Sequence, residues 1–165
     1  RWIAMEDMCS VLDLQPHDKY MGTIERVAKA VRALSTAPDD DLLVLVRRVL
    51  FTWLIADGDM HLKNMALLKI AHSGDAAFRT VRFAPVYDTL TTRVFPGLAH
   101  DRMALKLSGK DERLRRADFV ALASLAGLRA GDTQAAIDDV QQRLPLALAA
   151  LVLPRAPGQS PRYRS

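Results

Sequence analysis

Residues 38–64 read PDDDLLVLVRRVLFTWLIADGDMHLKN: an acidic start, a long apolar run and then a short polar segment. Pro38 and the three acids after it predict a helix start, because side-chain oxygens can bond free amides and negative charge suits the positive end of the helix dipole. The run from Asp40 to Ala56 is apolar nearly all round, and Arg47 and Arg48 are expected to form its one polar edge. A helix of this kind is predicted to lie at the centre of a domain.

Other parts of the sequence predict helices that pack around this one. Residues 24–34 repeat apolar side chains at spacings of three and four after a cap at Gly22-Thr23, which is typical of an amphipathic helix. Nearer the C-terminus we expect one helix from Arg116 to Gly127 and a second from Asp132 onward, kinked or restarted at Pro145.

The start of the chain also has apolar residues at helical spacing. Residues 5–12 have apolar side chains spaced near four and predict a short helix. Trp2, Ile3 and Met5 resemble core residues and are expected to be buried. Core residues at the very start of a chain suggest a piece of a longer protein.

Two short β-prone segments follow the polar stretch. Residues 65–70 and 78–83 are separated by turn-forming residues 73–75 and predict a small hairpin. Residues 103–107 predict another short strand. The expected fold is therefore one mostly α-helical domain over residues 1–153 with a small β-hairpin, followed by a disordered tail at 154–165.

Composition supports one soluble domain. The chain has 165 residues, of which 50% are hydrophobic, and a formal net charge of +4. Three arginines and no acid lie in residues 154–165, which leaves +1 for the rest, so the charge gives little support for a nucleic-acid partner. The single cysteine, Cys9, excludes an internal disulfide and is expected to be an inert buried thiol. No apolar run is long enough to span a bilayer, and a cytoplasmic location is expected.

Residues 59–64 place an acid, an imidazole, an ammonium and an amide directly after the apolar helix. Phosphoryl transfer requires an acid near the attacking hydroxyl, a basic group near the phosphate, and oxygen ligands for Mg²⁺. Asp59 is a candidate for the acid, and Asn64 with Asp88 for the metal ligands. The predicted hairpin would bring Asp88 back toward Asn64. The alternative is a polar surface loop in which Asp57 and Asp59 form a turn.

Longer motifs carry a resemblance to a known family. Residues 53–56 and 59–64, followed by residues 84–92, resemble the C-terminal lobe of HipA-type serine/threonine kinases, the toxins of bacterial toxin–antitoxin pairs. Supporting similarity lies in residues 5–9 with Lys19-Tyr20, and in residues 103–110 leading to 116–119.

The resemblance implies a helical lobe of a protein-kinase-like fold, with Asp59 as the catalytic aspartate and Asn64 and Asp88 as Mg²⁺ ligands. It also implies that His61 and Lys63 lie near the phosphates of ATP, the phosphoryl donor. Asp57 departs from the residue expected there, and we interpret it as a solvated turn residue. Expected partners are a protein substrate in the translation machinery and a DNA-binding HipB-like antitoxin, without DNA binding by this chain alone.

The nucleotide-gripping half of a kinase is not evident in this sequence. Its eight glycines form no phosphate-binding cluster, and no β-rich segment that could carry a phosphate-pairing lysine precedes Met5. We therefore expect this lobe alone to bind ATP poorly and to be inactive. Two alternatives remain open: a small-molecule phosphotransferase of the aminoglycoside or choline kinase kind, and a non-catalytic helical interaction module suggested by the basic face of Arg26, Lys29 and Arg32.

Overall fold

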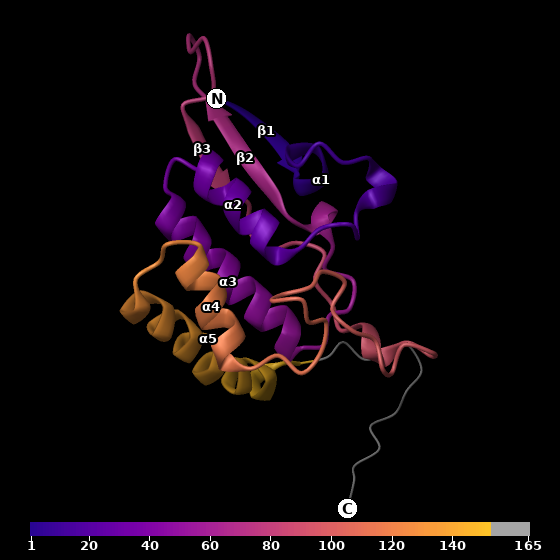
Figure 1. Cartoon of the computed structure of the whole chain (residues 1–165). Helices are drawn as coiled ribbons and strands as arrows, with labels where there is room; N and C mark the ends of the chain where they lie inside the picture. The colour runs from indigo at the N-terminus through magenta and orange to yellow at the C-terminus, as the bar shows by residue number, and fades with distance from the viewer. Residues whose placement is uncertain (153–165) are drawn as a thin grey trace, which may run out of the picture.

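A computed structural model describes residues 1–152. The helices are α1 (Met8–Val11), α2 (Ile24–Leu34), α3 (Pro38–Leu54), α4 (Arg116–Leu125) and α5 (Ala130–Ala150), with single 3₁₀ turns at Pro16–Asp18, Leu62–Asn64 and Thr92–Val94. The strands are β1 (Trp2–Asp7), β2 (Ala66–Ala71) and β3 (Thr80–Phe83), which form one small sheet in the order β1-β2-β3. The sheet lies toward one end of the molecule and α4 and α5 toward the other, with α2 and α3 between them (Figure 1).

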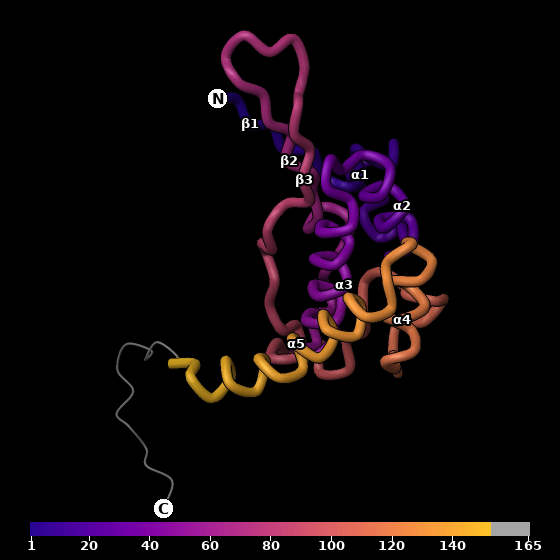
Figure 2. Tube along the Cα trace, turned by 90° about the vertical axis from the view of Figure 1, so that its left-hand side faces the viewer, coloured from indigo at the N-terminus to yellow at the C-terminus, as the bar shows by residue number. Residues whose placement is uncertain are grey.

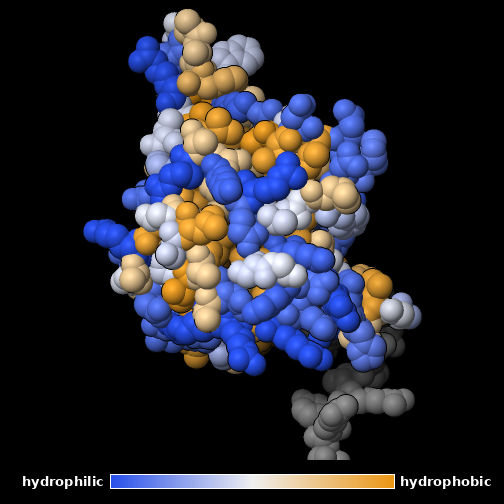
Figure 3. Space-filling model, in the orientation of Figure 1, coloured by the Kyte–Doolittle hydropathy of each residue, from blue (hydrophilic) through white to orange (hydrophobic). Residues whose placement is uncertain are grey.

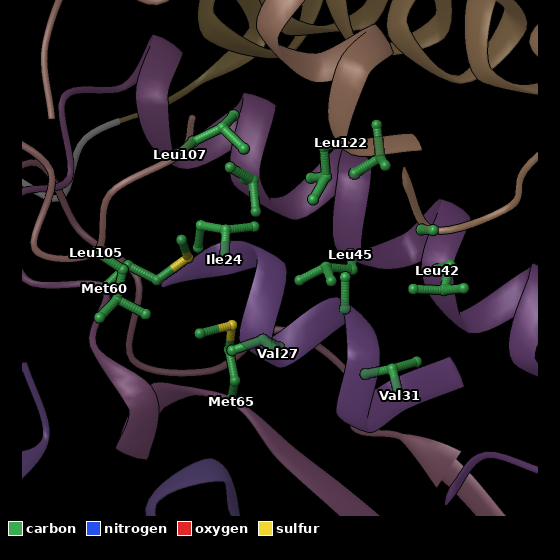
Figure 4. Packing of buried hydrophobic residues seen from close by; sticks show 14 of the residues in the cluster. Ile24, Val27, Val31, Leu42, Leu45, Met60, Met65, Leu105, Leu107 and Leu122 are labelled. Carbon is green, nitrogen blue, oxygen red and sulfur yellow. The ribbon is translucent and has the colours of Figure 1, made fainter. Parts of the chain in front are cut away.

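Helix α3 is the centre of the fold, as predicted. It contacts α2, α4, α5 and β3. Its buried face meets apolar residues of α2 and α4 in one continuous core (Figure 4). The labelled residues there include Leu42 and Leu45 of α3, Val27 and Val31 of α2, and Leu122 of α4. The segment that follows α3 therefore leaves from the most constrained part of the domain.

The predicted polar edge of α3 is wrong at Arg48, which is only 5% exposed. Its guanidinium lies 4.4 Å from the centre of the Phe83 ring and donates a hydrogen bond to the Ala84 carbonyl oxygen. A planar, weakly hydrated guanidinium tolerates this environment better than an ammonium would. Burial lowers the pKa of Arg48 to about 10.

The start of the chain also differs from the prediction. Trp2–Asp7 is strand β1, which pairs antiparallel with β2 from Trp2↔Ala71 to Asp7↔Ala66, and only Met8–Val11 is helical. Trp2, Ile3 and Met5 are 73%, 57% and 55% exposed, so the expectation that they are buried is wrong. Pairing with a strand more than fifty residues away overrides the local apolar spacing, which is a weak signal over so short a segment.

The predicted hairpin is confirmed. Strands β2 and β3 pair antiparallel with Leu67 opposite Phe83, and their connecting loop projects beyond the helices (Figure 2). The predicted strand at residues 103–107 is reduced to two isolated bridges, Thr23↔Lys106 and Leu107↔Lys110. Leu105 and Leu107 are nevertheless fully buried, which explains the apolar pattern of this segment.

Helices α4 and α5 close the domain near their predicted positions. Helix α5 continues through Pro145 without a restart. Pro145 and the preceding turn are largely exposed, so water can bond the carbonyl group that proline leaves free. The tail predicted at 154–165 lies outside the described residues. Polar side chains cover much of the face in Figure 3, with apolar patches between them. Within residues 1–152, no helix is both long and apolar enough to cross a bilayer.

Candidate active site

The polar loop begins where α3 ends. Ala56 adopts a left-handed conformation with φ 58°, which turns the chain away from the helix axis. Thr92 then fixes the loop from the other side: its Oγ1 accepts the Gly58 N–H at 3.0 Å, and its own N–H donates to the Ala56 carbonyl oxygen at 3.2 Å. The loop is therefore attached to the segment that carries Asp88.

The structure brings Asn64 and Asp88 together. The Asn64 Nδ2 group donates to Asp88 Oδ2 at 2.7 Å, and Asn64 Oδ1 accepts the His61 backbone N–H at 3.2 Å. Asn64 is buried, whereas Asp88 is exposed and has a left-handed φ of 52°. The bond between them joins the end of the polar loop to the segment that follows β3.

Asp59 receives a hydrogen bond from a residue that sequence reasoning did not place in the site. The Tyr20 hydroxyl group donates to Asp59 Oδ1 at 2.6 Å. This hydrogen bond, with some help from burial, raises the pKa of Tyr20. The Asp59 carboxylate can thus accept a proton-bearing hydroxyl from the exposed side of the loop.

His61 is buried and neutral. Its side chain is 6% exposed, and its Nε2 lies 2.8 Å from the Lys19 ammonium nitrogen. Burial, and then the charge of Lys19, lowers the pKa of His61. Because an ammonium can only donate, Nε2 must accept, and the ring proton is on Nδ1. That atom has no hydrogen-bond partner among residues 1–152.

Lys63 faces a different neighbour. Its ammonium nitrogen lies 2.7 Å from Asp7 Oδ2, at the end of β1, and its side chain is exposed. This ion pair raises the pKa of Lys63. The Lys63 carbonyl oxygen accepts the Tyr87 hydroxyl at 2.9 Å, which attaches the loop to the residue before Asp88.

Asp57 is not the solvated turn residue that the sequence suggested, since only 2% of it is exposed. Its Oδ1 accepts the Asp59 N–H at 3.0 Å, and its Oδ2 is buried without a hydrogen-bond partner in the described part of the chain. Burial raises the pKa of Asp57, the amides of Asp59 and Leu90 oppose this, and the charges of Asp59 and Asp88 add to it. Three acids therefore share one region of negative potential.

The residues Lys19 and Tyr20 were noted in the sequence only as part of a family motif. Their chemistry gave no separate signal, because they lie about forty residues before the loop and outside any helix or strand. The backbone joins the two segments as well, since the Leu62 N–H donates to the Lys19 carbonyl oxygen at 3.1 Å.

The donor set is compatible with a cation shared with phosphate. Residues 1–152 contain no cluster of three or more His, Cys, Asp or Glu side chains arranged around a possible ion. Mg²⁺ in phosphoryl-transfer sites, however, usually takes one or two protein carboxylates, with phosphate oxygens and water completing the shell. Asp88 and Asn64 fit that pattern if Asn64 turns its Oδ1 toward the ion, which replaces the bonds that its amide makes with the His61 N–H and with Asp88.

Fold and site together define a helical domain that presents an acid and an amide–carboxylate pair on the loops beside its central helix. The profile of the HipA-like C-terminal domain family matches residues 1–148, and the chain belongs to this family. The family resemblance found in the sequence is therefore confirmed.

Two relatives of this chain are named as putative kinases. The chain is 29% identical over 120 residues to "Putative kinase Y4mE" of Sinorhizobium fredii (strain NBRC 101917 / NGR234), a match that covers 70% of this chain and 26% of the relative. It is 33% identical over 90 residues to "Putative kinase Y4dM" of the same organism, covering 54% of this chain and 20% of the relative. The chain thus spans about a quarter of the length of these relatives or less.

A solved structure has the same fold. HipA of Shewanella oneidensis MR-1, solved in a toxin–antitoxin complex with HipB and operator DNA, matches with a TM-score of 0.75 at 17% identity. The match covers 93% of this chain and 38% of that one. The HipA-like fold, mostly helical with a small sheet, is therefore shown.

Proposed function

We propose that this chain is the catalytic lobe of an ATP-dependent serine/threonine protein kinase of the HipA type, which transfers the γ-phosphoryl group to a protein hydroxyl. One observation carries the proposal: the fold places Asn64 and Asp88, twenty-four positions apart, at 2.7 Å beside the loop that holds Asp59. A polar surface loop would not require this convergence. The kinase relatives and the family support the reaction class.

Each residue has a task in this reaction. Asp59 accepts a hydrogen bond from the acceptor hydroxyl and receives its proton as the phosphoryl group is transferred. The Tyr20 hydroxyl makes such a bond to Asp59 Oδ1, so this carboxylate already accepts a hydrogen bond from a hydroxyl group. Asn64 and Asp88 would hold Mg²⁺, which neutralises charge on the phosphates of ATP.

The partners follow from the family. The Shewanella protein was solved with HipB and operator DNA, and we propose a HipB-like antitoxin as a partner here. Protein substrates in the translation machinery remain the proposed acceptors. Asp59 would contact the acceptor hydroxyl, and Asn64 and Asp88 would bind Mg²⁺, so none of the three holds the nucleotide itself. We therefore propose that the lobe alone binds ATP weakly and that turnover requires a second lobe that binds the nucleotide.

Substitution in the full-length protein tests the proposal. Asp59→Gln and Asp88→Gln should each lower phosphoryl transfer from ATP to protein acceptors at least about a hundredfold. Asp40→Gln is the matched control, because Asp40 is a carboxylate with a 74% exposed side chain at the start of α3, and it should retain activity. Near-normal transfer by either site variant would overturn that residue's role.

The acceptor class is tested in the same assay. Transfer to serine or threonine of proteins supports the HipA-type kinase. Transfer to small amino-alcohol acceptors without protein phosphorylation would instead support the small-molecule phosphotransferase alternative.

A further inference from the structure

The lysine that contacts a side chain of the catalytic loop without a carboxylate partner is not the one that the sequence indicated. Lys63 was expected to contact phosphate, but its ammonium is held by Asp7 at 2.7 Å. His61 is buried and has its Nε2 lone pair occupied, so it is not a cation either. The ammonium that lies against this loop belongs to Lys19, which is 2.8 Å from His61 Nε2.

Lys19 is held in place without being neutralised. Its carbonyl oxygen accepts the Leu62 N–H at 3.1 Å, which fixes the segment to the loop. Its ammonium nitrogen lies 4.9 Å from the centre of the Tyr20 ring. Its charge partly opposes the rise in the pKa of Tyr20 that the hydrogen bond to Asp59 causes. Within residues 1–152, no ion pair joins Lys19 to a carboxylate.

A fixed ammonium with spare donors is suited to an anion. An ammonium has three N–H donors, of which His61 uses one. Asp57, Asp59 and Asp88 make the neighbourhood negative, yet none of them pairs with Lys19. The half-buried Lys19 side chain therefore has N–H donors left for an anion.

We infer that Lys19, and not Lys63, is the lysine of this lobe that contacts the phosphates of the nucleotide. His61 acts as a positioning residue, because its neutral Nε2 accepts from Lys19 and aims the ammonium. This inference rests on the proposed kinase function, and it assigns the phosphate contact to a segment that precedes the catalytic loop by forty residues.

The test compares three substitutions of Lys19 with one of Lys63 in the full-length protein. Lys19→Gln keeps a donor for His61 and removes the charge, whereas Lys19→Arg keeps both. Lys63→Gln is the matched control, since it removes the lysine charge that belongs to the catalytic loop itself. Lys19→Met removes charge and donor together. Affinity for Mg²⁺-ATP is measured by calorimetry, and phosphoryl transfer by a separate assay that gives KM and kcat.

We expect Lys19→Gln and Lys19→Met to raise the Kd for Mg²⁺-ATP about ten- to a hundredfold. Lys19→Arg should stay within about fivefold of the wild type, and Lys63→Gln within about twofold. KM for ATP should rise in parallel. Thermal denaturation distinguishes this from misfolding, because Lys19→Gln should melt close to the wild type.

Two results would overturn the inference: an unchanged Kd in Lys19→Gln, or a larger loss in Lys63→Gln than in Lys19→Gln. These results are distinguishable from failure of the proposed function. A wild-type protein that binds Mg²⁺-ATP through Lys19 but phosphorylates no acceptor supports the contact and contradicts the kinase. If the wild-type protein phosphorylates acceptors but Lys19→Gln leaves KM for ATP unchanged, the kinase function is supported and the Lys19 contact is contradicted.

Discussion

Asp41 links the central helix to the strand that leads to the site, and its removal should measurably destabilise the domain. The carboxylate is 2% exposed and accepts the Phe83 N–H at 2.8 Å. It also accepts from the Ser35 hydroxyl and from the Arg82 guanidinium at 2.9 Å. Asp41 is at the start of α3, and Phe83 is the last residue of β3.

The expected loss of unfolding free energy depends on which groups lose the Asp41 carboxylate as their hydrogen-bond acceptor. In Asp41→Ala the buried Phe83 N–H is left unsatisfied, which costs about 1–3 kcal/mol. Ser35 and Arg82 are only partly buried, so water replaces much of their loss, and together they add about 1 kcal/mol. The expected loss of unfolding free energy is about 2–4 kcal/mol, which corresponds to a fall in Tm of roughly 5–15 °C for a domain of this size.

Urea denaturation and thermal melting of the 165-residue chain measure this loss directly. Asp40→Ala is the control, because the neighbouring carboxylate is 74% exposed and its nearest atom lies 4.0 Å from Arg82. It should change the unfolding free energy by less than about 0.5 kcal/mol. A loss below about 1 kcal/mol in Asp41→Ala, or equal losses in both variants, would refute the role assigned to the buried acceptor.

Two further predictions concern the loop and its support. Burial raises the pKa of Asp57 in the folded state, so the folded state binds the proton more tightly than the unfolded state does. The charged form of Asp57 therefore destabilises the fold, and this loss develops as the pH rises from the ordinary carboxyl pKa toward the raised one. Asp57→Asn should therefore gain stability relative to the wild type at pH 7 and lose that gain near pH 3; a pH-independent difference in urea unfolding would contradict this. A Cβ atom at Gly22 would lie 2.8 Å from the buried Leu62 Cδ2, so Gly22→Ala should cost about 1–3 kcal/mol in unfolding free energy. Gly131→Ala is its control, since no atom lies within 4 Å and a helical alanine is favoured, and equal losses in the two variants would exclude the clash as the cause.

Several elements could be predicted from the sequence because their signals are local. The acids after Pro38 and the apolar run behind them specified α3, and the Thr23 side chain caps α2 as expected, accepting the Arg26 N–H at 3.3 Å. The β2–β3 hairpin followed from two β-prone segments around a turn. Spacing, caps and turns act within a few residues, so they are readable before the chain folds.

Part of the candidate site could be predicted because several of its residues are close together in the sequence. Asp59 to Asn64 occur together in one loop, and the hairpin explains how Asp88 returns to Asn64. The sequence could not show that Lys63 pairs with Asp7, because Asp7 reaches that position only through the pairing of β1 with β2.

By itself, then, the sequence determined the central helix, the hairpin and the polar loop between them. Only the tertiary structure decided that residues 2–7 form a strand and that Arg48 and Asp57 are buried. It also placed Lys19 and Tyr20 against His61 and Asp59. The physical reason is the same in each case: burial and pairing depend on which distant segments meet, and the free energy of those contacts exceeds the weak local preferences that a sequence pattern reports.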